Sequence, residues 1–210
     1  NVEGTYNVLE ASKEKNIEQV IVTSTSEVYG SGQTTSMSES HKLSAQSPYA
    51  ASKISADNIS MSYFKSYQSP VKIIRPFNCF GPRQSLRAVI PTIISQALFK
   101  KQIDIGNTHT TRDYTYVDDL AEAYFHVLKN KIFFGNVVNI GTNKENKISD
   151  IIKIIQKNLD KKVKIVKRDE RVRPSKSEVT RLRCNNNYII KNSSWKPRIT
   201  LKEGILNTTE

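Results

Sequence analysis

Tyr49 and Lys53 stand four residues apart in a segment that begins with Ser47 and Pro48, and their side chains could act together. Serine is a good N-cap and proline suits the first helical position, so a helix is predicted to begin here and to place both side chains on one face. An ammonium group close to a phenol favours the phenolate, which makes the tyrosine a base near neutral pH. The pair could therefore take a proton from a substrate hydroxyl, although two residues at this spacing are also common on a solvated helix face.

A polar run, Thr23-Ser24-Thr25-Ser26-Glu27, follows a strand that the apolar β-branched residues predict over 17–22. Ligands of open α/β sheets bind beyond the carboxyl ends of the strands, so we expect this run to lie at a binding site. With Tyr49 and Lys53 it offers a hydroxyl, a carboxylate, a phenol and an ammonium.

The strand ending in Thr-Ser-Thr-Ser-Glu-Val-Tyr-Gly and the later Tyr-x-x-x-Lys together resemble the extended short-chain dehydrogenase/reductase family, the NAD-dependent epimerases and dehydratases of nucleotide sugars. The resemblance implies an α/β fold: the C-terminal part of a Rossmann-like doubly wound parallel sheet plus a smaller α/β substrate-binding domain. Residues 1–80 would form the second half of the NAD-binding domain and carry the catalytic residues. Residues 81–210 would be mainly substrate-binding, with segments near 107–140 returning to the main sheet.

The glycines do not supply a dinucleotide fingerprint. The nearest approach is Gly30-Ser-Gly32, but Thr35 stands where the third glycine should be and no helix pattern follows. Residues 1–12 read as a helix already under way, and the chain stops soon after the capping box Thr200-x-x-Glu203 opens another. We therefore expect a longer protein whose first dinucleotide-binding half precedes residue 1, and only weak NAD binding by these 210 residues alone.

The resemblance also implies roles for single residues. The implied catalytic residues are Thr25, Ser26, Glu27, Tyr49 and Lys53, and the implied NAD contacts are Thr23, Tyr49, Lys53 and Pro76. The implied contacts to a nucleotide-diphosphate sugar are Asn78, Arg83, Val89, Arg112, Asn139 and Arg173. Arg112 suits the diphosphate because a guanidinium bonds such groups in a bidentate way. For Arg173 a flexible basic loop is the alternative interpretation.

Local patterns give three further expectations. Residues 77–84 are predicted to form a loop that ends in a Gly-Pro turn. Asp118 and Asp119 are expected to cap a helix that ends near residue 130. Ser149 is expected to cap a helix with an isoleucine stripe over 150–159.

The triplet Thr25-Ser26-Glu27 bears on the reaction. Many 4,6-dehydratases read Thr-Asp-Glu, whereas Thr-Ser-Glu resembles both GDP-mannose dehydratases and UDP-glucuronate decarboxylases. Residues 81–94 look most like dehydratases acting on nucleotide-activated N-acetylglucosamine on the way to legionaminic-type nonulosonic acids. A 4,6-dehydratase of UDP- or GDP-N-acetylglucosamine, serving surface polysaccharide or nonulosonic acid synthesis, is therefore the first hypothesis. A UDP-glucuronate decarboxylase is the second and a 4-epimerase the third.

The composition limits the other classes. A net charge of +12 could indicate nucleic acid, an anionic membrane surface or phosphorylated substrates. The lysines are spread along the chain without aromatic residues between them, which favours a solvated surface and leaves a basic nucleic-acid-binding module as an alternative. Two cysteines and three scattered histidines predict no metal site, and no apolar stretch approaches the length of a membrane span. We expect a cytoplasmic protein without a membrane partner, and the resemblance implies a homodimer when intact.

Overall fold

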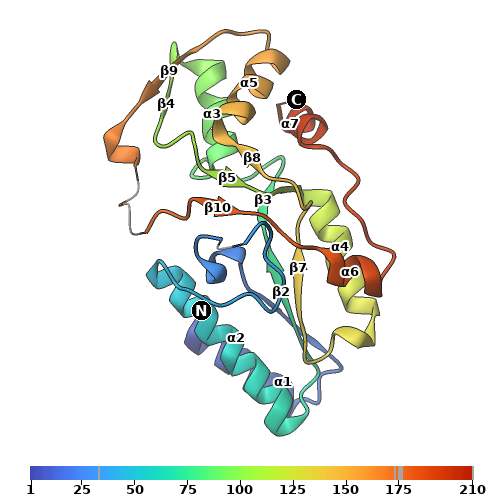
Figure 1. Ribbon diagram of the computed structural model, residues 1–210. Helices are drawn as coiled ribbons and strands as arrows, with labels where there is room; N and C mark the ends of the chain where they lie inside the picture. The colour runs from blue at the N-terminus through green and yellow to red at the C-terminus, as the bar shows by residue number, and fades with distance from the viewer. Residues whose placement is uncertain (33, 173, 175–176, 210) are drawn as a thin grey trace.

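Three parallel strands in the order β1-β2-β7 form the central sheet (Figure 1). The computed structural model describes residues 1–32, 34–172, 174 and 177–209. The strands are β1 (Val20–Thr23), β2 (Val71–Pro76) and β7 (Val137–Ile140). Val71, Ile73 and Ile74 of the middle strand are wholly buried, as expected of a parallel strand covered on both faces. The predicted strand over 17–22 begins later than expected, at Val20.

Helices cover both faces of this sheet. Helices α1 (Val2–Glu14) and α2 (Pro48–Tyr67) pack together on one face, and α4 (Val117–Lys129) lies on the other, with α6 (Asn187–Asn192) against β7 (Figure 1). The predicted start of α2 is confirmed, because the Ser47 hydroxyl accepts the Ala50 N–H at 3.1 Å and Pro48 occupies the first turn. We call the sheet with these four helices the sheet lobe.

A second lobe has an apolar core of its own. It contains α3 (Val89–Phe99), α5 (Ile148–Asn158), α7 (Leu201–Thr209) and a parallel pair of strands, β4 (Gln102–Ile105) and β9 (Lys164–Lys167). Its buried core is rich in isoleucine: Ile90, Ile93, Ile103, Ile148, Ile151, Ile152, Ile155 and Ile205. We call this the isoleucine lobe; with the sheet lobe it gives the α/β class that the sequence predicts.

Short strands join the two lobes. Strand β3 (Asn78–Phe80) pairs in parallel with β6 (Tyr114–Tyr116), and β5 (Thr111–Arg112) lies between β8 (Asn146–Lys147) and β10 (Arg181–Leu182). Three 3-10 turns complete the described elements: η1 (Ser26–Tyr29), η2 (Lys131–Phe133) and η3 (Asp169–Arg171). The prediction of a loop over 77–84 is wrong at β3, because that strand forms only by pairing with a segment more than thirty residues away.

Three predicted helix caps are also wrong. The N-cap of α4 is Tyr116 without a side-chain cap bond, so Asp118 and Asp119 lie in its first turn but do not cap it. Asp119 is buried in the first turn of α4, where its carboxylate accepts the N–H groups of Arg198 and Ile199 at 2.9 to 3.0 Å. It therefore binds the C-terminal segment to α4 instead of capping its own helix. Ser149 lies inside α5, whose N-cap is Lys147 without a side-chain cap bond. Within the part of the chain described, no helix has the length and apolar composition needed to cross a bilayer.

Candidate active site

A cavity of about 450 Å³ lies between the two lobes, beside the carboxyl ends of the central strands. Four of the residues predicted to act on substrate line it: Glu27, Asn78, Val89 and Arg112. They come from η1, β3, α3 and β5, so segments of both lobes build one site.

Glu27 enters the cavity because the chain turns sharply after β1. Thr25 is extended and its hydroxyl accepts the Glu27 N–H at 3.2 Å, which caps the turn η1. Glu27 then lines the cavity, whereas Ser26 is buried and does not. Of the predicted triplet, Glu27 is thus the member that lines the cavity, and the burial of Ser26 away from it disagrees with a direct catalytic role.

Tyr49 and Lys53 lie in the first two turns of α2, which packs against the turn that carries Glu27. The Lys53 ammonium donates to the Thr23 carbonyl at 2.7 Å, and the Thr23 hydroxyl lies 2.9 Å from that of Tyr124 on α4. The end of β1 is thereby tied to helices on both faces. Tyr49 is 47% exposed, so its phenol is open to a ligand at the carboxyl edge of the sheet.

Asn78 and Arg112 lie on the strands that join the lobes. The Asn78 N–H donates to the Asp113 carbonyl at 3.0 Å, which holds its side chain at the cavity wall. Arg112 is 9% exposed; its guanidinium donates to the Thr111 carbonyl at 2.9 Å and lies 3.7 Å from the Glu178 carboxylate. The cavity therefore contains a largely desolvated cation beside one carboxylate.

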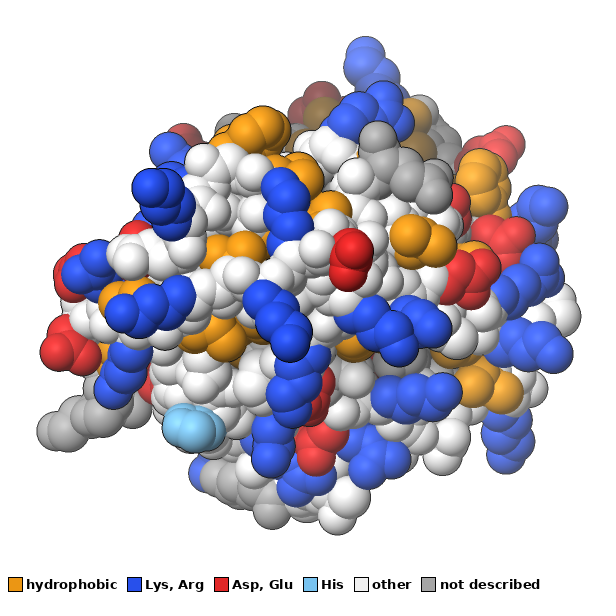
Figure 2. All heavy atoms as spheres, turned by 90° about the horizontal axis from the view of Figure 1, so that it is seen from above, with side chains coloured by type: hydrophobic (Ala, Val, Ile, Leu, Met, Phe, Trp, Pro, Cys, Tyr) orange, Lys and Arg blue, Asp and Glu red, His pale blue; other side chains and the backbone are white. Residues whose placement is uncertain are grey.

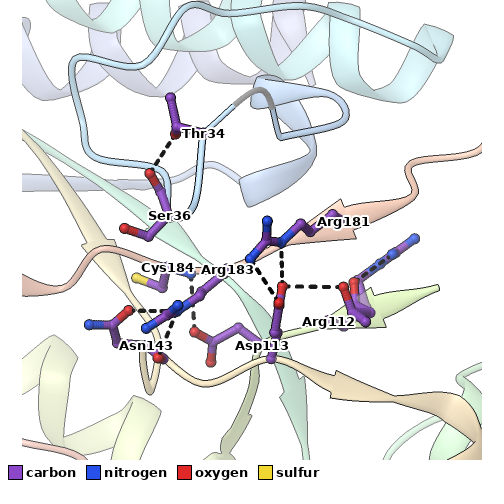
Figure 3. Close-up of polar contacts among 10 residues, drawn as sticks. Thr34, Ser36, Arg112, Asp113, Asn143, Arg181, Arg183 and Cys184 are labelled. Atoms are coloured by element: carbon purple, nitrogen blue, oxygen red, sulfur yellow. Dashed lines mark hydrogen bonds and ion pairs between the residues drawn. The ribbon is translucent and has the colours of Figure 1, made fainter. Parts of the chain in front are cut away.

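The strand that carries Arg112 is held by charged side chains of its neighbours (Figure 3). Arg181 on β10 donates twice to the Glu145 carboxylate, at 2.6 and 2.8 Å, and the Thr111 hydroxyl reaches the same carboxylate at 3.3 Å. Arg183 donates to both the carbonyl and the side-chain oxygen of Asn143 at 3.0 Å. These bonds fix β5 without using the Arg112 guanidinium.

Asp113, the residue after Arg112, points away from the cavity into the protein. Its carboxylate accepts from the Cys184 N–H at 3.1 Å (Figure 3). It also accepts from the Thr142 N–H and hydroxyl at 2.8 and 2.6 Å. Burial raises the pKa of this carboxyl above its usual range. Asp113 thus joins the segments that follow β7 and β10 to the cavity wall, through two backbone N–H groups and the Thr142 hydroxyl.

Three predicted substrate contacts are not placed at the cavity. Arg83 is exposed on the loop after β3, with φ at 64°, and does not line it. Asn139 is wholly buried: its side-chain oxygen accepts the Tyr29 hydroxyl at 2.7 Å and its amide donates to the Met37 carbonyl at 3.0 Å. The predicted substrate contact of Asn139 is therefore incorrect, since both ends of its side chain are used inside the protein. Arg173 lies outside the described residues.

Asn139 belongs to a buried polar chain behind the site. Asp57 on α2 receives two bonds of 2.9 Å from Arg75 on β2, and Arg75 donates to the Tyr29 hydroxyl at 3.0 Å. Burial raises the pKa of Tyr29 to about 12 and also raises that of Asp57, in spite of the adjacent Arg75. We call Asp57, Arg75, Tyr29 and Asn139 the buried chain; it links α2, β2, η1 and β7.

Two further arginines line the cavity, Arg87 and Arg171, which were not among the predicted site residues. Arg171 precedes the predicted Arg173 by two residues, so the same basic segment does reach the site. Its position depends on Gly106, where an added Cβ would lie 2.2 Å from the Arg171 carbonyl oxygen. Arg87 follows β3 in a loop that carries no local signal of its own.

Cysteine and metal chemistry find no support in the described residues. Cys79 lines the cavity, but burial raises the pKa of its thiol to about 11, which keeps it protonated near neutral pH. Among those residues, no group of three or more His, Cys, Asp or Glu side chains could hold a metal ion. The ionisable groups that line the cavity are mainly the carboxylates of Glu27 and Glu178 and the guanidinium groups of Arg87, Arg112 and Arg171, whereas Tyr49 and Lys53 are not among its lining residues.

Known proteins match nearly the whole chain. The family described as GDP-mannose 4,6 dehydratase matches residues 1–208. Human dTDP-D-glucose 4,6-dehydratase is 34% identical over 224 residues, a match that covers 100% of this chain and 61% of that protein. A putative UDP-glucose 4-epimerase of Methanocaldococcus jannaschii is 32% identical, and the match covers 98% of this chain and 66% of that protein.

Solved structures agree in fold. The dTDP-glucose 4,6-dehydratase of Bacillus anthracis, in complex with NAD, has a TM-score of 0.89 and 32% identity over 99% of this chain and 66% of that one. The UDP-glucuronic acid 4-epimerase of Bacillus cereus, in complex with UDP-glucuronic acid and NAD, has a TM-score of 0.92 and 28% identity. That match covers 99% of this chain and 65% of the epimerase. The chain spans between 38% and 61% of the length of the first curated relatives that it matches.

Proposed function

The chain belongs to the GDP-mannose 4,6-dehydratase family of nucleotide-sugar enzymes, and on that premise we propose that the protein is an NAD-dependent 4,6-dehydratase of UDP- or GDP-linked N-acetylglucosamine. The observation that carries the proposal is the presence of Glu27 in the same cavity as Asn78 and Arg112. Dehydration across carbons 5 and 6 of a hexose needs a base for the carbon 5 proton. A carboxylate that shares a cavity with candidate substrate-binding groups can serve as that base.

The residues at the sheet edge fit the reactive end of NAD. Tyr49 is exposed there, Lys53 is held by the Thr23 carbonyl, and Pro76 ends the middle strand of the sheet. We assign Thr23, Tyr49, Lys53 and Pro76 to cofactor contact, as open α/β sheets bind ligands beyond their carboxyl ends. NAD, when bound, would accept a hydride from carbon 4 of the sugar and return it to carbon 6.

The protons are moved by side chains of this chain. Tyr49 takes the proton of the carbon 4 hydroxyl as carbon 4 becomes a ketone, with Lys53 one turn further along α2 and Thr25 supplying a hydroxyl. The ketone acidifies carbon 5. Glu27 then removes the carbon 5 proton and passes it to the carbon 6 hydroxyl, which leaves as water. Carbon 5 takes up a proton from solvent when carbon 6 receives the hydride.

Arginines of the cavity suit the diphosphate of the substrate. Arg112 is buried at the cavity wall, and Arg87 and Arg171 line the same space. Guanidinium groups form charge-assisted, bidentate bonds to phosphates. We propose that Arg112 contacts the diphosphate, that Arg171 assists it, and that Asn78 and Val89 contact the nucleotide sugar.

The experiment is a product assay by mass spectrometry with UDP- and GDP-linked N-acetylglucosamine and with UDP-glucuronate. We expect loss of water from an amino-sugar nucleotide and entry of one solvent deuterium at carbon 5. Glu27→Gln should retain oxidation at carbon 4 but stop water loss and deuterium entry, because an amide cannot accept the proton. Tyr49→Phe should stop the oxidation itself, and Glu3→Gln, on the exposed face of α1, should behave as the parent.

A 4-epimerase is the second candidate, supported by the similarity to the solved UDP-glucuronic acid 4-epimerase. An epimerase would invert carbon 4 without any change of mass. Loss of carbon dioxide from UDP-glucuronate, with no water lost from either amino sugar, would indicate a decarboxylase and overturn the dehydratase proposal.

A further inference from the structure

Two lysine-rich segments that are far apart in the sequence meet at the outer end of the isoleucine lobe. Residues 99–101 include the last residue of α3 and the two that follow it, and residues 160–162 follow α5. The Lys161 ammonium donates to the Leu98 carbonyl at 3.2 Å, which joins the two segments directly. The pairing of β4 with β9, Gln102 opposite Lys164, places the residues before each strand side by side.

Six exposed lysines belong to this end. An open hollow of about 540 Å³ is lined by Lys153, Lys157, Lys161 and Lys162 together with Gln156 and Asp160. Lys100 and Lys101 extend the charge from the other segment, and both are exposed. The acids on this patch are Asp160 and Asp150, and Asp150 lies 3.4 Å from Lys153. Figure 2 shows the molecule from this end, with more Lys and Arg than Asp and Glu on the surface and hydrophobic side chains between them.

A large apolar side chain stands next to the lysines. Phe99, the last residue of α3, is 83% exposed, the largest exposed fraction among the large hydrophobic residues described. It directly precedes Lys100 and Lys101. We call Phe99 and the six lysines the basic end.

We propose that the basic end binds the surface of a bilayer that contains anionic phospholipids. Lysine ammonium groups on flexible stems suit a layer of headgroups, to which each contributes a similar, salt-screened attraction. Phe99 supplies the apolar side chain that enters the boundary between headgroups and acyl chains. The lysines and the phenylalanine thus combine electrostatic attraction with apolar insertion on one surface.

Nucleic acid is the less favoured partner for this end. Single-stranded binding surfaces interleave several aromatic platforms with their charges, whereas the basic end has one aromatic side chain and no arginine. The basic end is also separate from the cavity, whose lining residues include none of its seven members. The proposal is therefore independent of the reaction that the cavity performs.

The test is co-sedimentation of the full chain with vesicles of phosphatidylcholine alone and of phosphatidylcholine containing phosphatidylglycerol. We expect binding only to the anionic vesicles at about 0.1 M salt and its loss at about 1 M, where the Debye length falls from about 10 Å to about 3 Å. Lys161→Glu with Lys162→Glu should weaken binding by at least about 25-fold, since each lysine contributes about 1 kcal/mol near such a surface. The control is Lys15→Glu with Lys65→Glu, at the C-terminal ends of α1 and α2 in the sheet lobe. This pair changes the net charge equally and should weaken vesicle binding far less.

Phe99 gives an independent readout. Phe99→Ala should weaken vesicle binding at low salt without changing the steepness of its salt dependence. In Phe99→Trp, the emission of the new indole should shift to shorter wavelength on binding, whereas Trp195, 2% exposed, should not respond.

Equal losses of vesicle binding in the two double-lysine variants would overturn the proposal, as would equal binding to the two kinds of vesicle. Binding of duplex RNA or DNA that is stronger than vesicle binding and depends on Lys161 and Lys162 would replace the bilayer by nucleic acid. Circular dichroism of each variant confirms that it folds.

Discussion

The two lobes are stabilised in different ways. The interior of the sheet lobe contains the buried chain of Asp57, Arg75, Tyr29 and Asn139, which joins one helix, two strands and the turn that carries Glu27. The interior of the isoleucine lobe is apolar, and its charges lie outside. Polar bonds have direction, so the buried chain can hold the reactive groups in one geometry, whereas apolar packing holds helices together with less constraint on single side chains. The sheet lobe, which carries the proposed catalytic residues, is thus the lobe whose interior contains a chain of buried hydrogen bonds.

Removal of one member of the buried ion pair should have the largest effect on stability. Arg75→Ala leaves Asp57 buried without its cation, and we expect a loss of about 3 to 5 kcal/mol in the free energy of unfolding, measured with urea at neutral pH. The double variant Asp57→Leu with Arg75→Met should recover most of this loss, because apolar groups of similar size can replace a buried pair. A single variant with less than about 1 kcal/mol of loss would show that the pair does not hold the sheet lobe together.

The isoleucine lobe should respond as an apolar core does. Ile152 is wholly buried on α5, and Ile152→Ala should cost about 3 kcal/mol through lost burial and a cavity, with about 1 kcal/mol for Ile152→Val. We expect the same loss at low and high salt in urea denaturation. A loss that changes strongly with salt would mean that the exposed lysines, and not the isoleucines, govern this lobe.

The buried chain should also make the sheet lobe sensitive to alkaline pH. The pKa of Tyr29 is raised from an ordinary value of 10 to about 12, so the folded state keeps a proton that the unfolded chain loses. The stabilisation is complete below about pH 10 and decreases by up to about 3 kcal/mol as the pH rises through 12. Tyr29→Phe should lack this part of the decrease in urea denaturation, although its stability near pH 8 is lower by the lost hydrogen bonds. Parallel curves for parent and variant would contradict the assignment.

The smallest expected effect lies where the lobes meet. The Glu178 carboxylate lies 3.7 Å from Arg112, so it competes with a bound diphosphate for the same cation. Glu178→Gln should tighten the binding of UDP by about 1 kcal/mol, roughly fivefold, in calorimetric titration. Uridine, which lacks phosphates, serves as the control and should bind unchanged; equal tightening of both would point to a change of cavity shape.

Local sequence determined much of this protein. The start of α2 at Ser47 and Pro48, the buried strand β2 and the isoleucine face of α5 were predictable, because caps and periodicity depend on residues only a few positions apart. The family was also predictable from Tyr49, Lys53 and the polar run after β1, and the match over residues 1–208 confirms it. The predicted cap at Thr200 is confirmed too, since its hydroxyl accepts the Glu203 N–H at 3.2 Å.

Only the tertiary structure decided which polar side chains face a ligand. Asn139 and Asp119 look equally available in the sequence, yet one bonds Tyr29 and the other bonds the backbone of residues 198 and 199. The entry of Glu27 but not Ser26 into the cavity, the formation of β3 and the meeting of residues 99–101 with 160–162 likewise depend on distant segments. The physical reason is that a buried hydrogen bond, or a surface formed by two segments, depends on residues that are distant in the sequence and that the fold brings together. A local pattern of residue types does not predict which residues those are.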